Sequence, residues 1–569
     1  MNLLIVMASA QAAIEPDFLM DSDPTLREPD PVKKFTRDFK GIWIQALERP
    51  ETDMQRMAAE TISRAHQYGV PGLIEAVPVL EKILRAKATH PAARFSAARA
   101  LIVLESRSSA EKLLEASQDF GADLRQLVEP AMARWDVVAA RAIWMKRLET
   151  PSTRPRDLIL AIRGLGMVHE TTALPTLLKT TLDLVSPVDL RLEAASAAGE
   201  LSHEGLEQEA DKLIQETGSP QLINRLCAIR LLSHHESELA RTKLTELAQD
   251  AEPSIVAPAL KRLNEIDPVL VLPLAEAALN QSDAYVREQA VFAYLSLPTA
   301  ERIKLLRLLL ADPQPFLRQQ VCEGFYRLAQ NPEWNESIRG AAIEVLAGER
   351  WQGQEQAALL LGQLEHKSAA MRLVELLESP RPEVMVASAW ALRKVAVPAS
   401  IPAMLDKAFR QTVARKMRTL PGVDHQVAHL LEACGQMKLV QARLLLLMYI
   451  PKDLLMGERS RGAAIWSLGW LHEGALDTDL GKALIGRVED TSARPPESLL
   501  IRQQCVVALA RMKAVDYAPA FQVQIAHGTP PTRLGLAFRW AVKQLTGEDR
   551  PEPVPSIADQ GSWFLEPLP

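Results

Sequence analysis

Apolar residues recur along most of the chain with the spacing of an amphipathic helix. Val286, Ala290 and Tyr294 fall on one helical face, and the stretch 317–328 repeats this stripe about one period, or 31 residues, later. Each such stretch is followed by a second apolar stretch, for example residues 303–310. The pattern therefore predicts units of two helices, each joined as a hairpin.

A turn signal recurs about every 30 residues through the middle of the chain. It stands at Ser186-Pro187, Ser219-Pro220, Glu252-Pro253, Ser282-Asp283, Asp312-Pro313 and, after a less regular gap, Ser379-Pro380. A fixed period of this length indicates a stack of small units, none of which can bury its hydrophobic face without a neighbour. The sequence therefore predicts an all-α solenoid of roughly a dozen or more helical hairpins.

The repeat unit resembles the HEAT repeat, in the short bacterial form that also occurs in relatives of the phycobilisome lyases. The resemblance rests on the proline or aspartate between units, the Val-Arg or Leu-Arg step of the first helix, the alanines that follow, and Leu-Gly near its end. The matching residues are Arg191, Arg225, Arg287, Arg318, Leu165-Gly166 and Leu468-Gly469. Over roughly residues 55–545, the resemblance implies a right-handed α-solenoid in which second helices line the inner surface.

Four segments are expected along the chain. They are a signal-peptide remnant (1–12), an extended leader (13–40), the HEAT-like solenoid (41–548) and a proline-rich tail (549–569). The solenoid is expected to be irregular near 415–455 and near 491–497, where the period lengthens or prolines interrupt it. The tail is either disordered or docks Trp563 and Phe564 onto the last repeats.

The amino terminus has features of a secretory signal. Residues 3–8 form an apolar run that is followed by two small-x-small patterns, Ala8-Ser9-Ala10 and Ala10-Gln11-Ala12, but no basic residues precede the run. One explanation is a true start upstream of Met1, and the alternative is an apolar end without a signal. We expect export to the periplasm or the cell exterior instead of a cytoplasmic location, and we expect no membrane span.

Composition narrows the class of function without identifying a ligand. With 47% hydrophobic and 24% charged residues, the chain of 569 residues is expected to be ordered. The net charge of -6 gives no overall attraction to nucleic acid. The four cysteines, Cys227, Cys322, Cys434 and Cys505, lie too far apart in sequence for a zinc motif, and we expect buried free thiols.

Histidines recur just after the first helix of several units, at His169, His203, His234 or His235, His366 and His472. Stacked hairpins lie about 10 Å apart, so equivalent positions form a ladder that cannot share one metal ion. A histidine there can meet the exposed carbonyls of a helix end, and a structural role is expected. The sequence His234-His235-Glu236 is the best candidate for an exception.

Motifs for catalysis are not found. The sequence has no phosphate-binding glycine loop, dinucleotide fingerprint, nucleophile elbow or HExxH helix. Residues 109–112 spell SxxK, but a match this short arises by chance and its companion motifs are missing. We therefore expect no catalytic residue, no bound cofactor and no metal site.

Two basic clusters and one pair of tryptophans remain as candidates for binding. The clusters are Lys33, Lys34, Arg37 and Lys40, and Arg410, Arg415, Lys416 and Arg418. Neither has the interleaved aromatic residues that stack bases, so solvated surfaces are expected. Trp466 and Trp470 share a helix face, and core packing is their expected role, whereas exposed indoles would anchor a partner peptide.

These observations favour a non-enzymatic scaffold that binds a protein or protein segment along an extended surface. The resemblance leaves open an enzyme or enzyme subunit that handles a tetrapyrrole, as the phycobilisome lyases do. Nucleic-acid binding by helical repeats is a third, less favoured hypothesis. Neither the partner protein nor the oligomeric state is specified by the sequence.

Overall fold

The computed structural model describes residues 14–30, 39–216, 218, 220–414, 419–526, 532–549 and 553. The predictions for residues 1–12, for the basic residues at 33–37 and 415–418, and for Trp563 and Phe564 of the tail lie outside the described residues. Within the described part, every regular element is a helix. The expected all-α solenoid is thus confirmed.

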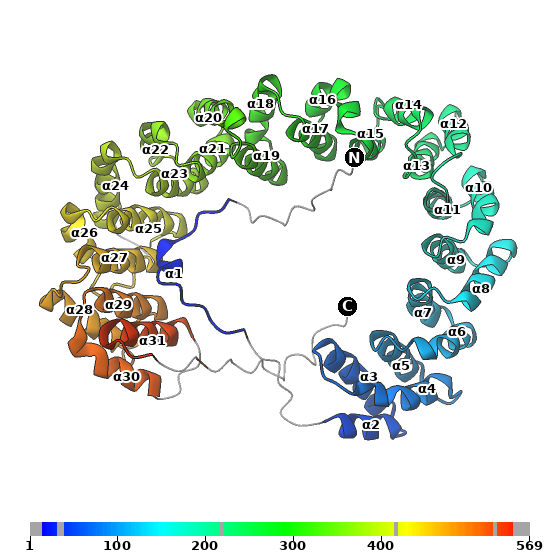
Figure 1. Cartoon of the computed structure of the whole chain (residues 1–569), viewed down its shortest axis with the longest axis horizontal. Coiled ribbons are helices and arrows are strands. Elements are labelled where there is room, and N and C mark those ends of the chain that lie inside the picture. The colour runs from blue at the N-terminus through cyan, green and yellow to red at the C-terminus, as the bar shows by residue number, and fades with distance from the viewer. Residues whose placement is uncertain are drawn as a thin grey trace. The chain divides into compact units, whose positions relative to one another are not determined.

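The helices alternate between two layers (Figure 1). After α2 (Lys40–Glu48), the first helices of the units are α3 (Thr52–Gln67), α5 (Pro91–Val103), α7 (Ala122–Arg134), α9 (Pro155–Met167), α11 (Val188–Leu201), α13 (Gln221–Leu231), α15 (Pro253–Ile266), α17 (Ala284–Ser296), α19 (Pro315–Leu328), α21 (Trp351–Gln363), α23 (Pro382–Val395), α25 (Pro421–Gln436), α27 (Glu458–Leu471), α29 (Leu499–Arg511) and α31 (Arg533–Thr546).

The second helices are α4 (Val77–Arg85), α6 (Ala110–Asp119), α8 (Val138–Glu149), α10 (Leu174–Leu182), α12 (Glu207–Gln215), α14 (Glu238–Leu247), α16 (Leu272–Leu279), α18 (Ala300–Leu306), α20 (Pro332–Ala347), α22 (Ala370–Leu376), α24 (Ile401–Val413), α26 (Arg443–Leu447), α28 (Thr478–Val488) and α30 (Ala518–Ala526). Short 3₁₀ turns precede several of them. None of the described helices is both long and apolar enough to cross a membrane.

The chain divides into two units, which we describe separately. The carboxy-terminal unit comprises Met1–Pro31 and Tyr294–Ser556, and the amino-terminal unit comprises Val32–Ala293 and Ile557–Pro569. Within each unit, first helices pack side by side, as α23, α25, α27 and α29 do. The cysteines lie in the interiors of these stacks as buried free thiols, as the sequence predicts.

First helices, not second helices, line the inner side of each unit (Figure 1), so the expectation about the inner surface is wrong. The reason is the position of the turn signal. Most second helices pack against the first helix that follows them, as α10 does with α11 and α28 with α29. The Ser-Pro or Asp-Pro turn therefore lies inside a packed pair of helices, and it does not separate one pair from the next.

Three of the four recurring arginines bind backbone carbonyls at or near this turn, whereas Arg225 pairs with the carboxylate of Asp250 at 2.6 Å. The guanidinium of Arg191, only 1% exposed, donates from Nε to the carbonyl of Thr181 in α10 and from Nη2 to Oδ1 of Asn224 in α13, at 3.0 and 2.6 Å. Arg287 and Arg318 make the same kind of contact with the carbonyls of their own turns. Unpaired carbonyls at a buried helix end cost free energy, and the need to satisfy them explains why an arginine recurs at this position.

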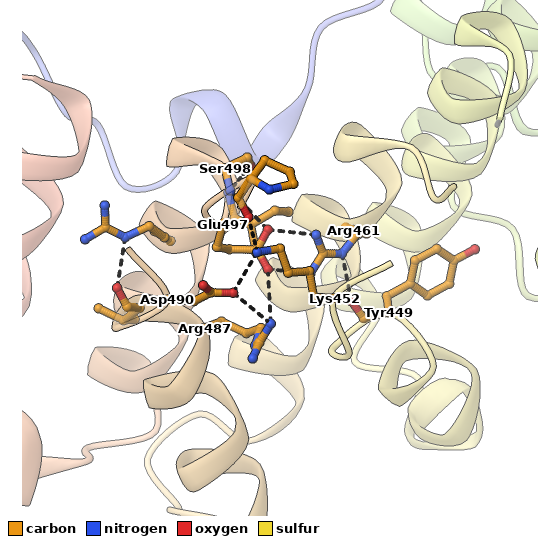
Figure 2. Close-up of polar contacts among 11 residues, drawn as sticks. Tyr449, Lys452, Arg461, Arg487, Asp490, Glu497 and Ser498 are labelled. Carbon is orange, nitrogen blue, oxygen red and sulfur yellow. Dashed lines mark hydrogen bonds and ion pairs between the residues drawn. The ribbon is translucent and has the colours of Figure 1, made fainter. Parts of the chain in front are cut away.

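Ion pairs in the carboxy-terminal unit hold the irregular segment 491–497 and the residue before it. Figure 2 shows Arg461 of α27 binding both carboxylate oxygens of Glu497 at 2.9 Å, and Lys452 binding Asp490 at 2.9 Å. Burial raises the pKa of Glu497, but the hydrogen bonds and charge of Arg461 outweigh this and hold the pKa below its usual range. The segment 491–497 is therefore fixed to the repeat before it by charged side chains.

Candidate functional site

Residues 14–30 lie along the inner side of the carboxy-terminal unit, against its first helices (Figure 1). Apart from the single turn of α1 (Leu19–Ser22), this segment has no regular secondary structure. From here on, the leader means residues 14–30, the described part of the predicted leader 13–40 that belongs to this unit, and the residues that contact it form the leader site. The leader site consists of Trp390, Arg393, His425, His429, Glu432, Arg459, Gly462, Trp466, Trp470, Gln504 and Arg511.

Met20 is the most deeply held residue of the leader, with 1% of its surface exposed. Its backbone N–H donates to Oε1 of Glu432 at 3.0 Å, and its carbonyl accepts from Nε2 of Gln504 at 2.9 Å. A Cβ on Gly462 would lie only 2.9 Å from its sulfur, so the glycine makes room for this side chain. Both polar groups of one peptide residue are therefore satisfied by side chains of the solenoid.

Asp17 forms the first charged contact of the leader. One carboxylate oxygen accepts from the indole Nε1 of Trp390 at 2.6 Å and from Nη2 of Arg393 at 2.7 Å. Partial burial raises the pKa of Asp17, but the hydrogen bond from Trp390 and the charges of Arg393 and Lys394 outweigh this and hold the pKa below the ordinary value of 3.8. The site thus favours an ionised carboxylate at this position.

A buried ion pair lies beneath the leader. Arg393 and Glu432 are 2.5 Å apart, and their side chains are 1% and 0% exposed. Glu432 uses one oxygen for Arg393 and the other for the N–H of Met20. A buried pair of this kind is tolerated only when further hydrogen bonds satisfy its remaining polar atoms, and the leader supplies two of them.

Phe18 occupies an aromatic position between Asp17 and Met20. Its ring stacks on His429, with centroids 4.4 Å apart and planes 9° from parallel, and meets the ring of His425 edge-on at 5.3 Å. The guanidinium of Arg459 lies 4.9 Å from the Phe18 centroid. Burial lowers the pKa of His429, which keeps this ring neutral at pH 7 and suited to stacking against an apolar ring.

The last part of the contact is formed by Asp21 and Asp23. Arg459 donates to Asp21 at 2.7 Å. Arg511, which lies over the ring of Trp470, forms an ion pair with the Asp23 carboxylate at 2.6 Å and also donates to its backbone carbonyl at 3.2 Å. Two acidic side chains of the leader thus each meet an arginine from a different first helix.

Trp466 is buried, as the sequence predicts, and both tryptophans also contact the leader, which the sequence does not predict. Nε1 of Trp466 donates to the carbonyl of Asp23 and Nε1 of Trp470 to its carboxylate, both at 3.0 Å. Trp466 is 2% exposed. The pair thus binds an extended segment, and that segment is part of the same chain.

A cavity adjoins the leader at Asp21. Its volume is about 280 Å³, and its walls come from α27, α29 and α31. Leu500 and Leu534 give it an apolar wall, and its charged lining from the solenoid consists of the basic Arg459 and Arg533 and the acidic Glu458. The binding surface therefore extends beyond the atoms that the leader covers.

The other candidates from the sequence are not among the residues of the leader site. Lys40 pairs with Glu75 at 2.8 Å, and Arg410 pairs with Glu378 at 2.6 Å. The rings of His203 and His234 stack with centroids 5.0 Å apart, so side chains of neighbouring repeats do touch, contrary to the spacing argument. Among the described residues, no group of three potential ligands could hold a metal ion.

The periodicity of the sequence does not single out the charged residues of the leader site. One signal was available in α25, where His425, His429 and Glu432 follow a helical spacing in an otherwise largely apolar helix. A second signal is Arg393, which lies three residues before Ala396, a residue with a left-handed backbone. In the next repeat the left-handed residue is Lys438, and Gly435 stands at the position that corresponds to Arg393. The site is therefore indicated by polar residues that stand where other repeats have apolar or small residues.

Comparison with known proteins agrees with this architecture. Residues 335–419 match the family model of HEAT repeats. Kap95p, in a structure that concerns its binding to RanGDP, aligns with a TM-score of 0.53 at 12% identity, over 89% of this chain and 72% of that chain. A structure of importin beta gives 0.51 at 12% identity, with the same coverage.

A structure of Kap121p bound to Pho4p gives a TM-score of 0.50 at 11% identity, over 88% of this chain, which spans 56% of that chain. At such identities the likeness concerns the fold alone. No curated protein matches in sequence. Fold and repeat pattern together define an α-solenoid with a peptide-lined inner face. The chain is an α-solenoid that contains HEAT repeats.

Proposed function

We propose that this HEAT-repeat protein is a non-enzymatic scaffold that binds an extended segment of a partner protein at the leader site. The hold on Met20 carries the proposal. Glu432 and Gln504 bind its backbone N–H and carbonyl, groups that nearly every residue of a partner also has. In peptide recognition, backbone hydrogen bonds supply affinity and side-chain pockets supply specificity, and the leader site combines both.

The similar structures support a binding role by analogy. The Kap121p structure contains bound Pho4p, and the Kap95p structure concerns its binding to RanGDP. Fold analogy of this kind raises the expectation of a protein partner but names none. For this chain, the main support for a binding function therefore comes from the contacts of the leader site.

The test uses the full-length chain with a weakened leader. In what we call the open-site variant, Asp17→Asn, Met20→Ser and Asp23→Asn remove two carboxylates and the buried side chain. A fluorescein-labelled peptide with the wild-type sequence of residues 14–30 is then titrated against it by fluorescence anisotropy. We expect saturable binding with a Kd on the order of micromolar, as for short segments that order on binding.

The matched control adds Trp470→Phe and Arg511→Gln to the open-site variant. These two changes remove three of the contacts to Asp23 while leaving the aromatic ring at position 470. Binding that is weakened about tenfold or more places the peptide at the leader site. No measurable binding to the open-site variant itself would contradict the proposed function.

A further inference from the structure

We infer that the leader is an intramolecular competitor for its own site, and that the partner segment that replaces it is acidic, with carboxylates spaced like Asp17, Asp21 and Asp23 around a Met20-like residue. This inference rests on the proposed function and adds the chemistry of the partner and the means of regulation.

Charge complementarity selects an acidic segment. Three arginines from three first helices, Arg393, Arg459 and Arg511, each bind one carboxylate of the leader. Indole N–H groups from α23 and α27 donate to the first and the last of these carboxylates, and an indole can only donate. The acidic residue of the site, Glu432, is already engaged by Arg393. A basic segment would meet like charge at all three positions.

The apolar contacts define the spacing between the carboxylates. Met20 enters the space above Gly462, three residues after the first carboxylate and one before the second. Phe18 lies on the neutral ring of His429. The matching pattern is therefore acidic, aromatic, any residue, unbranched apolar, acidic, any residue, acidic. Met suits the fourth place because its unbranched chain adapts to a narrow gap.

The leader is attached in a way that allows exchange. Met20 is the only buried residue of the segment 14–30, and the side chain of Asp17 remains 55% exposed. The leader is held by side-chain contacts on the surface of helices that pack against one another without it. It can therefore leave without opening the core of the solenoid.

A partner can nevertheless outcompete a tethered segment. Tethering gives the leader an effective concentration on the order of millimolar, so a partner needs contacts that the leader lacks. The cavity of about 280 Å³ beside Asp21 offers them through Leu500, Leu534 and Arg533. A partner with an apolar residue and a further carboxylate near this point would fill the cavity and pair with Arg533, whose Nη1 is 3.9 Å from Asp21 in the present contact.

The experiment compares the labelled 14–30 peptide against wild type, the open-site variant and a control variant, Thr25→Ala with Glu28→Gln, which alters the leader outside the contacts described above. We expect the Kd of the peptide for the open-site variant to be lower, by about tenfold or more, than its Kd for wild type and for the control. A peptide with asparagine at the positions of Asp17, Asp21 and Asp23 should bind the open-site variant about tenfold or more weaker than the native peptide.

The outcomes separate the two proposals. Equal binding to wild type and the open-site variant overturns the competitor role and leaves the proposed function standing. Equal binding of the native and asparagine peptides overturns the acidic selectivity alone. Binding to none of the three proteins overturns the proposed function and this inference with it. Circular dichroism of each variant checks that the helical stack is unchanged.

Discussion

The backbone N–H of Met20 donates a hydrogen bond to the carboxylate of Glu432, 412 residues later in the chain and 3.0 Å away. The other oxygen of that carboxylate binds Arg393, and Arg393 in turn binds Asp17. The leader and the buried ion pair therefore form one network. Substitutions in the ion pair should therefore weaken docking of the leader, and substitutions in the leader should destabilise the ion pair.

Glu432→Gln should destabilise the carboxy-terminal unit. The substitution leaves the buried charge of Arg393 with only the half-exposed Asp17 as a partner, and removing one member of a buried pair costs about 3 kcal/mol or more. The measurement is the free energy of unfolding in urea. The double variant Arg393→Met, Glu432→Met should regain most of the loss, because no unpaired charge stays buried. A double variant as unstable as the single one would contradict this explanation.

Arg191→Met should destabilise the amino-terminal unit by about 2–3 kcal/mol, because the Thr181 carbonyl and the Asn224 amide lose a charged partner in the interior. The matched control is Arg163→Met, since the Arg163 side chain is 59% exposed and pairs with Glu193 at the surface. The control should change the free energy of unfolding by about 1 kcal/mol or less. Equal losses in the two variants would rule out the role given to the recurring arginine.

Docking of the leader should weaken in acid. The pKa of Asp17 is lower when docked than in the free leader, so its contribution is fully present above the free pKa and is lost as the pH falls through the docked pKa. The facing groups are Trp390, Arg393, Lys394 and, across Arg393, Glu432. The indole ¹⁵N–H signal of Trp390 should titrate below the ordinary aspartate value of 3.8. Asp17→Asn should abolish this titration, and a midpoint above 3.8 would contradict the assignment.

Added bilin or haem should leave the visible spectrum of the ligand unchanged when the protein is titrated in. The leader site is matched to backbone amides and carboxylates instead of a macrocycle, because its hydrogen-bonding groups are spread over four first helices. The control is a haem-binding protein under the same conditions. A shifted absorption band with saturable binding would favour the tetrapyrrole hypothesis over the scaffold.

The helical architecture could be predicted because it depends on local patterns. Stripes such as the one through Val286 and Ala290 specify a helix within a few turns, and the repeated turn signal specifies stacking. Which helices line the inner side could not be predicted, because the sequence does not show which of its two neighbours a given helix packs against. Contacts in the structure, such as those of α10 with α11, settle this question.

The leader site could not be predicted because it joins distant residues. Asp17 meets Trp390 across 373 positions, and Asp23 meets Arg511 across 488. No periodicity links an extended segment to a surface that far along the chain. Trp466 and Trp470 were visible as a pair, but their partner was not, so core packing was the simpler interpretation.

Hydrogen exchange in the full-length wild-type protein measures whether the leader is bound at the leader site. We expect the Met20 amide to exchange far more slowly than in the free 14–30 peptide, and we expect the open-site variant to lose this protection. If the Met20 amide of the wild-type protein exchanges at the rate of the free peptide, the leader is not bound at the site.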